Sequence, residues 1–512
     1  MEFILKEALS GIGHRLIAGD EDVSFAGIKW DSRKVTSGDM FIAVIGGGTD
    51  GHRYIEKAIS LGASVVVCDN KQDVLSDDEL VSLSQGKVTI LAIDDTRTGM
   101  AKISANMYDH PEQAIKLYGI TGTKGKTTSA FMLHSILSAS GSKTGLMGTV
   151  CNLIGDKREE AVHTTPEAPV TYEFLSRLSR SGFDSCVMEV SSLGLKLERV
   201  CGMKYEVGCF TNLYSDHIGG IEHPDMEDYF ASKLLIFDHC YKAAVNADSA
   251  RIDEIRARAD ECGVRTVYYG IDNDADIMAK NLRFGSRDNI NGTIFDIVIN
   301  HETYPEEVFV PIPGRFNVYN ALCAITAAYL EGLDLKTSIK ALAGVRVPGR
   351  LEPVDNRLGL NILVDYAHNG EALSNVIETA KEFTSGRVIT LFGCGGDRPS
   401  ARRTEMGKVA GEMSDLTVIT SDNPRTEDPM AIINDILMSI NNTNGLYEVE
   451  PDRSKAIFKA VSEAREGDTV LIAGKGHETY QEINGVKHHF DDHEKAAQAV
   501  AEIEKLRGFA DL

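Results

Sequence analysis

The residues of this chain that are best suited to chemistry form a short glycine-rich loop, Gly122-Thr-Lys-Gly-Lys-Thr-Thr128. An apolar run at 115–120 precedes it, and apolar residues at helical spacing follow from 129 to 137. In a strand, loop and helix of this kind, backbone N–H groups hold phosphate oxygens, the lysine reaches the terminal phosphates, and the following hydroxyl can bind Mg²⁺. Ile120 stands where the strict motif has glycine. We predict a nucleoside triphosphate site, with a chance glycine loop as the alternative; its residues are Gly122, Thr123, Lys124, Gly125, Lys126, Thr127 and Thr128.

Two further polar side chains follow predicted strands downstream of this loop. Glu189 lies in the run Cys186-Val-Met-Glu-Val190, and His217 comes shortly after Val207-Gly-Cys-Phe-Thr211. Because the carboxyl ends of parallel strands meet at one edge of a sheet, we expect both side chains near the glycine loop. A carboxylate and an imidazole there can complete the shell of a cation that also touches the phosphates. A capping glutamate and a surface histidine are the alternative.

Three more residues have a spacing or context that bears on a nucleotide site. Asn317 and Asn320 are three residues apart, so their side-chain amides share a helix face and can bind the edge of a purine. For Asn317 a helix cap is the alternative. Lys233, within Phe230-Ala-Ser-Lys-Leu-Leu235, has the pattern of an ordinary helix lysine, and that pattern assigns it no role.

Polar loops follow three strands that we predict in the last third of the chain. The loops are Gly393-Cys-Gly-Gly-Asp-Arg398, Ser421-Asp-Asn-Pro-Arg425 and Gly474-Lys-Gly-His-Glu478. Ligands of open α/β sheets bind outside the carboxyl ends of strands, where these loops should gather. One such loop alone would be interpreted as a turn, but three together predict a binding site.

The elements that must position these residues alternate between strands and helices, which predicts an α/β protein with a central parallel sheet and right-handed crossovers. We expect three domains, at 1–108, 109–343 and 344–512, with a linker at 108–112 and a hinge at 344–350. A helix from Asn317 to Leu330 should close the middle domain. The predicted strands are 40–45, 63–68, 88–93, 115–120, 186–190, 207–211, 243–246, 387–392, 416–420 and 469–473.

Composition excludes several classes of protein. The net charge of −23 over 512 residues argues against nonspecific attraction to nucleic acid or anionic membranes. The nine cysteines are scattered singly, which gives no disulfide framework or zinc site and suits a reducing cytoplasm. No signal pattern and no apolar run long enough for a bilayer is present, so we expect a cytoplasmic protein without membrane insertion. We also expect a monomer.

The chain resembles the Mur ligase family, because these motifs occur in the same order along the chain as in that family. Mur ligases are ATP-dependent enzymes that build the peptide stem of bacterial cell wall precursors. The resemblance implies a UDP-binding N-terminal domain, a central P-loop ATPase and a Rossmann-like C-terminal domain for the incoming amino acid. The matching segments are Gly119 to Thr128, Glu189-Val-Ser-Ser192, Gly314-Arg-Phe-Asn317 with Asn320, and Val364-Asp-Tyr-Ala-His-Asn369, supported by Asp31-Ser-Arg-Lys34, Asp50-Gly-His52 and His163-Thr-Thr-Pro-Glu167.

Within the family, the chain is most similar to the branch that adds the third residue to UDP-MurNAc-L-Ala-D-Glu. That resemblance implies an acyl phosphate on the D-glutamyl carboxyl, which the amine of an amino acid then attacks. It implies that Lys126, Lys233, Glu189 and His217 are catalytic. It implies further that Mg²⁺ is held by Thr127, Glu189, His217 and Lys233 as N6-carboxylysine, that ATP also contacts Asn317, Asn320, Arg350, Asp365 and His368, and that the UDP-MurNAc-peptide is held by Ser32, Thr164, Thr165, Ser191 and Arg199.

The segment Asp422-Asn-Pro-Arg425 is the family's form for meso-diaminopimelate rather than L-lysine. Diaminopimelate carries a second carboxylate at its far end, onto which a guanidinium forks, whereas lysine's ammonium would be repelled. Glu478 should face the distal ammonium. Surface ion pairs are the alternative for each residue of this expected pocket, which consists of Arg398, Asp422, Asn423, Arg425, Gly474 and Glu478.

Three positions depart from the family pattern: Leu193 stands where histidine or glutamine is usual, the loop 215–223 is altered, and Gly370 replaces a common proline. They leave open a divergent ligase that adds L-lysine or another amino acid, a folylpolyglutamate synthase, and a catalytically silent nucleotide-binding relative. Asp31-Ser-Arg33 and Arg425 argue against the lysine and folyl alternatives. Retention of Lys126, Glu189, His217 and Lys233 argues against the silent one.

Overall fold

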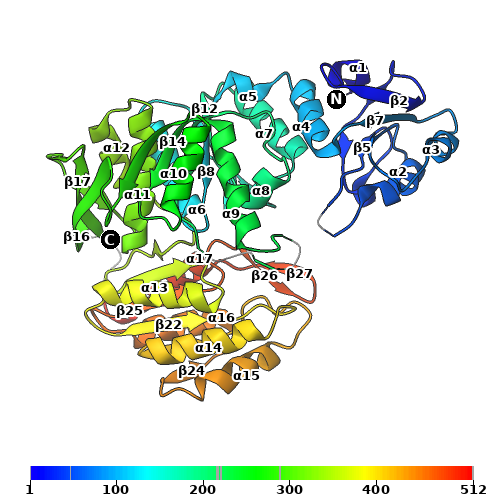
Figure 1. The fold of residues 1–512 in the computed structure, drawn as a ribbon. Helices are drawn as coiled ribbons and strands as arrows, with labels where there is room; N and C mark the ends of the chain where they lie inside the picture. The colour runs from blue at the N-terminus through cyan, green and yellow to red at the C-terminus, as the bar shows by residue number, and fades with distance from the viewer. Residues whose placement is uncertain (1, 47, 215–217, 220–221, 288–289, 510–512) are drawn as a thin grey trace. The chain divides into compact units, whose positions relative to one another are not determined.

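The computed structural model describes residues 2–46, 48–214, 218–219, 222–287 and 290–509. The chain divides into two compact units. The first unit consists of Met1–Met278 and Leu322–Ser338, and the second of Ala279–Ala321 and Ile339–Leu512. Both are mixed α/β structures, in which helices pack against sheets (Figure 1).

The N-terminal part of the first unit is a small sheet with helices. Its elements are β1 (Phe3–Ile4), α1 (Leu5–Ala8), β2 (His14–Ala18), β3 (Ser24–Phe25), β4 (Ile28–Lys29), the 3-10 helix η1 (Ser32–Lys34), β5 (Met40–Ile42), η2 (Gly51–Tyr54), α2 (Ile55–Ser60), β6 (Val65–Asp69), α3 (Asp77–Ser84), β7 (Thr89–Ile93) and α4 (Thr96–Met107). The strand order is β2-β7-β6-β5-β4, with β4 to β7 parallel and β2 antiparallel at the edge. The predicted strands at 40–45, 63–68 and 88–93 are therefore confirmed as β5, β6 and β7.

A larger sheet forms the rest of the first unit. Its elements are α5 (Pro111–Ala114), β8 (Lys116–Thr121), α6 (Lys126–Ala139), β9 (Thr144–Met147), β10 (Cys151–Ile154), β11 (Lys157–Glu160), α7 (Ala168–Arg180), β12 (Ser185–Glu189), α8 (Ser192–Lys196), β13 (Tyr205–Phe210), α9 (Met226–Leu234), η3 (Leu235–His239), β14 (Cys240–Asn246), α10 (Ile252–Glu261) and β15 (Arg265–Gly270). The order is β11-β10-β9-β12-β8-β13-β14-β15. Strands β9, β12, β8, β13, β14 and β15 run parallel to one another. The predicted parallel sheet is confirmed.

The antiparallel extension β10–β11 was not predicted. Strand β11 consists only of Lys157-Arg-Glu-Glu160, which has no apolar alternation. Charged residues are typical of an edge strand because they discourage pairing with other chains. The pattern that marks a buried strand is therefore absent where the strand lies at the border of the sheet.

Strand β16 (Ile277–Arg287) begins in the first unit, beside β15, and continues into the second. It is followed by β17 (Ile290–Ile299), β18 (Glu302–Thr303), β19 (Val308–Val310), α11 (Arg315–Leu330) and α12 (Leu335–Leu342). The predicted helix through Leu330 is α11. Residues 279–321 belong to the second unit. This division into two units does not test the expected domain boundaries at 108 and 343, which stay a prediction.

The C-terminal sheet has the order β20-β21-β25-β22-β23-β24, parallel except for β20. Its elements are β20 (Glu352–Pro353), β21 (Asn361–Asp365), α13 (Gly370–Phe383), β22 (Val388–Phe392), α14 (Ala401–Met413), β23 (Leu416–Ile419), α15 (Pro429–Ile440), β24 (Tyr447–Val449), α16 (Arg453–Glu463), β25 (Thr469–Ala473), the hairpin β26 (Tyr480–Ile483) and β27 (Val486–His489), and α17 (Asp492–Leu506). Helices α13, α14 and α15 lie next to one another, and α16 packs against α17 (Figure 1). Since β21, β22, β23 and β25 are parallel, the predicted polar loops leave the same edge.

A buried ion pair fastens two of these loops. Arg453 and Asp492, the first residues of α16 and α17, have fully buried side chains. The guanidinium forks onto the carboxylate, with N–O distances of 2.7 and 2.6 Å. It also donates to the carbonyls of Ala473, at the end of β25, and Ser421, after β23, at 2.9 and 3.4 Å. One side chain thus holds the start of both loops.

We expect Arg453→Met to lower the free energy of unfolding by about 3–5 kcal/mol, because it leaves the carboxylate of Asp492 buried without its partner. Urea denaturation followed by circular dichroism measures the change. Lys455→Met on the same helix is the matched control, since its side chain is exposed and its ion pair contributes at most about 1 kcal/mol. Equal unfolding curves for the two variants would contradict the role given to this pair.

Candidate active site

The glycine loop connects β8 to α6 as predicted. Gly122 has a φ of 140° and Gly125, at the N-cap of α6, has a φ of 86°, a region that favours glycine. A Cβ atom at Gly122 would lie 1.9 Å from the hydroxyl oxygen of Thr211. Thr211 follows β13, so close approach of this neighbouring strand requires glycine at 122. The expected strand, loop and helix are therefore all present, and the N-terminus of α6 faces the loop.

Side chains that follow β13 hold the loop in shape. Asn212 accepts from the backbone N–H of Lys124 at 2.8 Å and donates to its carbonyl at 3.0 Å. The hydroxyl of Thr211 donates to the same carbonyl at 2.7 Å. The ammonium of Lys126 donates to the carbonyls of Gly122 and Thr123 at 2.8 and 3.0 Å. Sequence analysis assigned no role to Asn212, because that role depends on the distance between two strands.

Glu189 lies at the end of β12 and is almost fully buried. Its carboxylate accepts from the hydroxyl of Thr127 at 3.0 Å, and from both the hydroxyl and the backbone N–H of Thr149 at 3.0 and 2.8 Å. Carboxylate and hydroxyl oxygens are the ligands that Mg²⁺ prefers, so Thr127 and Glu189 fit such an ion. Thr149 was missed by the sequence analysis. His217, the other expected ligand, lies outside the described residues.

Lys233 lies on α9, and its side chain is buried, which its helix pattern did not indicate. The ammonium donates to the carbonyl of Gly122 at 2.8 Å and stands 4.4 Å above the ring centroid of Tyr229. The Tyr229 hydroxyl in turn donates to that of Thr123 at 3.2 Å. A buried lysine therefore reaches the glycine loop from a different helix. Within the described residues, no three His, Cys, Asp or Glu side chains form a metal site by themselves.

Four of the five residues expected to hold the UDP-MurNAc-peptide lie beside Glu189. Thr164 shares a hydrogen bond with Thr149 at 3.0 Å, and Thr165 donates to the carbonyl of Glu189 at 3.0 Å. Thr165 also accepts from the backbone of Ser191 at 2.9 Å and, through its carbonyl, from Arg199 at 3.0 Å. The fifth residue, Ser32, is buried in η1 of the N-terminal sheet region.

Ser192, next to the altered position Leu193, and His223, the last residue of the altered loop, belong to one chain of hydrogen bonds. The hydroxyl of Ser192 lies 2.9 Å from Nε2 of His223, and Nδ1 of that ring lies 2.6 Å from the carboxylate of Asp228. Lys196 pairs with the same carboxylate at 2.6 Å. The buried His223, although it belongs to the altered loop, therefore connects α8 to the start of α9.

The remaining residues expected at ATP belong to the second unit. Asn320 donates to the amide oxygen of Asn317 at 3.1 Å, so the two amides share a face of α11 as predicted. Asp365, at the end of β21, accepts from the backbone of Leu351 and of Ala367, both at 2.8 Å, and burial raises the pKa of its carboxyl. Arg350 lies over the ring of Tyr366, and His368 is exposed with Nδ1 2.8 Å from the Tyr366 carbonyl.

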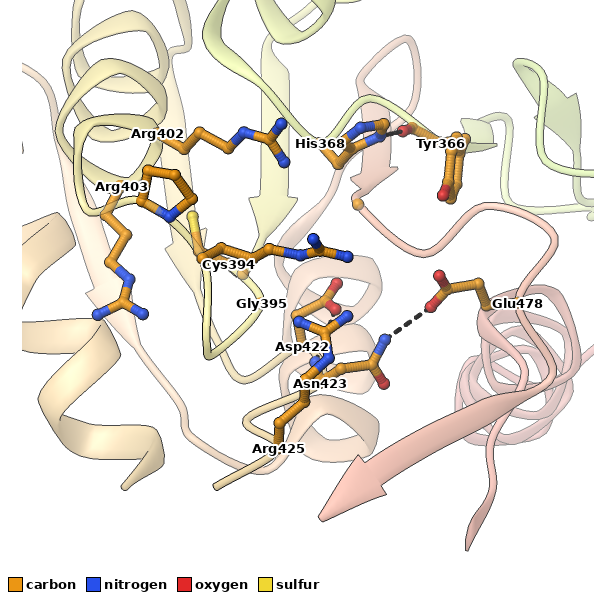
Figure 2. Close-up of a pocket in the computed structure, with 14 residues that line it drawn as sticks. Tyr366, His368, Cys394, Gly395, Arg402, Arg403, Asp422, Asn423, Arg425 and Glu478 are labelled. Atoms are coloured by element: carbon orange, nitrogen blue, oxygen red, sulfur yellow. Dashed lines mark hydrogen bonds between the residues drawn. The ribbon is translucent and has the colours of Figure 1, made fainter. Parts of the chain in front are cut away.

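A pocket lies where the three predicted C-terminal loops meet (Figure 2). All six residues expected at the incoming amino acid line it: Arg398, Asp422, Asn423, Arg425, Gly474 and Glu478. The loop after β21 adds Tyr366 and His368, and α14 adds Arg402 and Arg403, which the sequence analysis missed. Parallel strands bring the loops together, so this gathering could be predicted, whereas the contribution of a helix face could not.

Charges of both signs line the pocket. Within the described part of the chain, the guanidiniums of Arg398 and Arg402 make no hydrogen bond or ion pair, whereas Arg403 is paired with Glu427 and Asp435. The backbone of Arg425 is fixed by the hairpin, because its N–H donates to the carbonyl of Glu482 at 3.0 Å and its carbonyl accepts from Asn484 at 2.7 Å. Two carboxylates, from Asp422 and Glu478, complete the lining.

Gly370, one of the departures, has a packing reason. A Cβ atom there would lie 2.9 Å from that of Glu405 on α14. Asn369 caps α13 by accepting from the backbone of Ala372 at 2.8 Å. This helix start is therefore intact, and the absence of a larger residue at 370 allows α13 and α14 to approach closely.

Family models match three segments of the chain. Residues 24–108 match the "Mur ligase family, catalytic domain", residues 120–328 the "Mur ligase middle domain", and residues 349–476 the "Mur ligase, glutamate ligase domain". The chain belongs to the Mur ligase family and is an enzyme of the ligase class, with the N-terminal, middle and C-terminal domains of that family.

Relatives with a specific name are similar over nearly the whole chain. UDP-N-acetylmuramoyl-L-alanyl-D-glutamate--2,6-diaminopimelate ligase of Clostridium botulinum is 43% identical, covering 93% of this chain and 95% of that protein. The ligase of the same name from Clostridium perfringens is 40% identical, covering 96% and 98%. A solved structure of a ligase with this name aligns with a TM-score of 0.68 at 29% identity, covering 98% of this chain and 99% of that one.

Within the described residues, no helix is long and apolar enough to cross a membrane. The nine cysteines are free thiols.

We expect Thr149→Val to raise the Mg²⁺ concentration for half-maximal activity by about 10–100-fold, because residues that orient a metal ligand contribute that much to metal affinity. Activity as a function of Mg²⁺ concentration is the measurement. Thr144→Val is the matched control, since the buried Thr144 begins β9, at the end of the strand away from Thr149, and its hydroxyl bonds to Ser142 and Ser185. An unchanged Mg²⁺ requirement for the Thr149 variant would show that Glu189 is positioned without it.

Proposed function

We propose that this chain is an ATP-dependent ligase that joins meso-diaminopimelate to the D-glutamyl carboxyl of UDP-MurNAc-L-Ala-D-Glu, a step in peptidoglycan precursor synthesis. The observation that carries the proposal is the pocket of the second unit, where guanidiniums and carboxylates face one cavity. The names of the relatives at 43% and 40% identity support it. Mur ligases use ATP and Mg²⁺, and a MurF ligase of Thermotoga maritima with a related fold was solved with ADP.

The charges of the pocket suit a ligand with two amino-acid ends. Diaminopimelate carries at its far end both a carboxylate and an ammonium. The guanidinium of Arg425 would bind that carboxylate, with Arg398 beside it, and the carboxylate of Glu478 would bind the ammonium. L-Lysine has no distal carboxylate, so it would offer no carboxylate to Arg425 or to the guanidinium of Arg398.

The reaction follows in two steps. The D-glutamyl carboxylate attacks the γ-phosphorus of ATP and forms an acyl phosphate, while the bond to ADP breaks. The amine of diaminopimelate then attacks the acyl carbon, loses a proton and expels phosphate, which leaves an amide. Lys126 and the backbone of the glycine loop would stabilise the charge on the transferred phosphoryl group, where fixed positive charge lowers the barrier most.

Thr127, Glu189, His217 and Lys233 would hold Mg²⁺, which when bound neutralises phosphate charge. We assign Lys233 the carbamylated form, N6-carboxylysine, because an ammonium repels a divalent cation whereas a carbamate offers two hard oxygen ligands. Its buried position at the carbonyl of Gly122 supports this, since the side chain is already directed to the loop that would hold the phosphates.

Phosphate release with ATP, Mg²⁺ and UDP-MurNAc-L-Ala-D-Glu should require meso-diaminopimelate and stay near background with L-lysine or with no amino acid. Arg425→Met should lower kcat/KM for diaminopimelate about 100-fold. Removal of the guanidinium leaves the distal carboxylate of the ligand without its partner, which costs about 2–5 kcal/mol. The KM for ATP is the internal control and should not change. Preference for L-lysine would overturn the substrate, and phosphate release with no amino acid dependence would overturn the ligase.

We expect Lys233→Ala to be nearly inactive and to recover part of its rate in added short carboxylates such as formate or acetate, which supply the missing oxygen ligands. Depletion of CO₂ and bicarbonate should slow the wild-type enzyme and leave the variant unaffected. If neither treatment changes the rates, the carbamate assignment is wrong, although the ligase assignment stands. Because carbamates are lost in acid, the readout is the reaction rate and not mass spectrometry of peptides.

A further inference from the structure

Lys475 is a fully buried lysine behind the pocket. It lies between Gly474 and Gly476, whose φ values are 115° and 52°. A Cβ atom at Gly476 would lie 2.7–2.9 Å from Tyr366, and one at Gly474 would lie 2.9 Å from the carboxylate of Asp422. Neighbours on both sides therefore hold the loop in a conformation that directs the lysine inward, although nothing in the two-step reaction uses this side chain.

The ammonium of Lys475 joins two residues of the pocket. It donates to Oδ1 of Asn423 and to Oε2 of Glu478, both at 3.0 Å. The same Oδ1 accepts from the backbone N–H of Glu482 at 2.9 Å, so the oxygen of this amide is saturated and its nitrogen must point the other way. That nitrogen donates to Oε2 of Glu478 at 2.8 Å (Figure 2). One buried cation thus fixes which way the amide faces and which carboxylate oxygen stays available.

We propose that Lys475 is a positioning residue that makes the pocket selective for an amino acid with a distal carboxylate. This inference rests on the proposed function and deepens it. With its two bonds to Oε2 in place, Glu478 presents Oε1 to the distal ammonium of the ligand. The positive charge of Lys475 offsets the charge of Glu478, so this end of the pocket neither repels a distal carboxylate nor attracts a lone ammonium strongly.

Removal of the ammonium changes that balance in one direction. In Lys475→Met, the charge of Glu478 is uncompensated, so it repels the carboxylate of diaminopimelate and attracts the ammonium of L-lysine. We expect KM for diaminopimelate to rise at least about tenfold, because hydrogen bonds to charged groups contribute on that scale. The ratio of kcat/KM for diaminopimelate to that for L-lysine should fall at least about tenfold, with a smaller effect on kcat.

Glu478→Gln should act in the opposite direction. It leaves the cation and removes the anion, so the same ratio should rise even though diaminopimelate binds less tightly overall. In the double variant Lys475→Met/Glu478→Gln, the ratio should lie near that of the wild-type enzyme, because the two changes cancel in charge and act on one contact. If Lys475 were needed only for packing, Lys475→Met would lower activity toward both amino acids equally. The kcat/KM ratio would then not change in opposite directions in Lys475→Met and Glu478→Gln.

The test is steady-state phosphate release by the full chain with each amino acid in turn, for the wild-type enzyme and these three variants. The ammonium groups of Lys475 and Lys487 both lie over the ring of Tyr480, 5.5 and 3.9 Å from its centroid. Lys487→Met is the matched control, because Lys487 is exposed. It should leave KM and the ratio unchanged.

A wild-type enzyme that does not respond to diaminopimelate would overturn the proposed function itself. If it does respond, an unchanged ratio in Lys475→Met overturns the positioning role. Should that variant not fold, Glu478→Gln decides alone: a ratio that falls contradicts the charge balance, and a ratio that rises supports it.

Discussion

The candidate sites of this chain depend on one property of parallel sheets, that the carboxyl ends of all strands lie along the same edge. In the first unit this edge brings the glycine loop after β8 together with Glu189 at the end of β12 and Thr211 after β13. In the second unit it brings together the loops after β21, β22, β23 and β25. Segments that are far apart in sequence therefore supply side chains to one place without any special folding device.

Within that frame, hydrogen bonds to fixed backbone atoms set the geometry of the phosphate loop. Asn212 binds both the N–H and the carbonyl of Lys124, and Lys233 reaches the carbonyl of Gly122 from α9. Preorganised groups of this kind stabilise developing charge without reorganisation during the reaction. Glu189 is prepared in the same manner, because three donors fix both of its oxygens before any cation binds. The loop and the carboxylate thus belong to one hydrogen-bonded site, joined through Thr127.

The pocket of the second unit is organised by two buried cations with different roles. Arg453 binds Asp492 and the carbonyls at the start of two loops, so it sets where the loops begin. Lys475 binds Asn423 and Glu478, so it sets how the pocket surface is oriented. A buried charge is costly unless it is fully paired, and each of these satisfies several polar groups at once. The exposed guanidiniums of Arg398 and Arg402 remain for a ligand.

The sequence by itself determined the α/β class, the strands that carry the sites and the glycine loop, because each follows from a local pattern or from the shared edge of parallel strands. Together with the family resemblance it also indicated six of the residues that line the pocket. It did not reveal Thr149, Asn212 or Lys475, since their roles depend on contacts across strands or on the inside of a loop that composition does not mark. It also assigned Lys233 the pattern of an ordinary helix residue. Only the tertiary structure, by burying that side chain against Gly122, decided otherwise, because burial is a property of packing between elements and not of the residues within one helix.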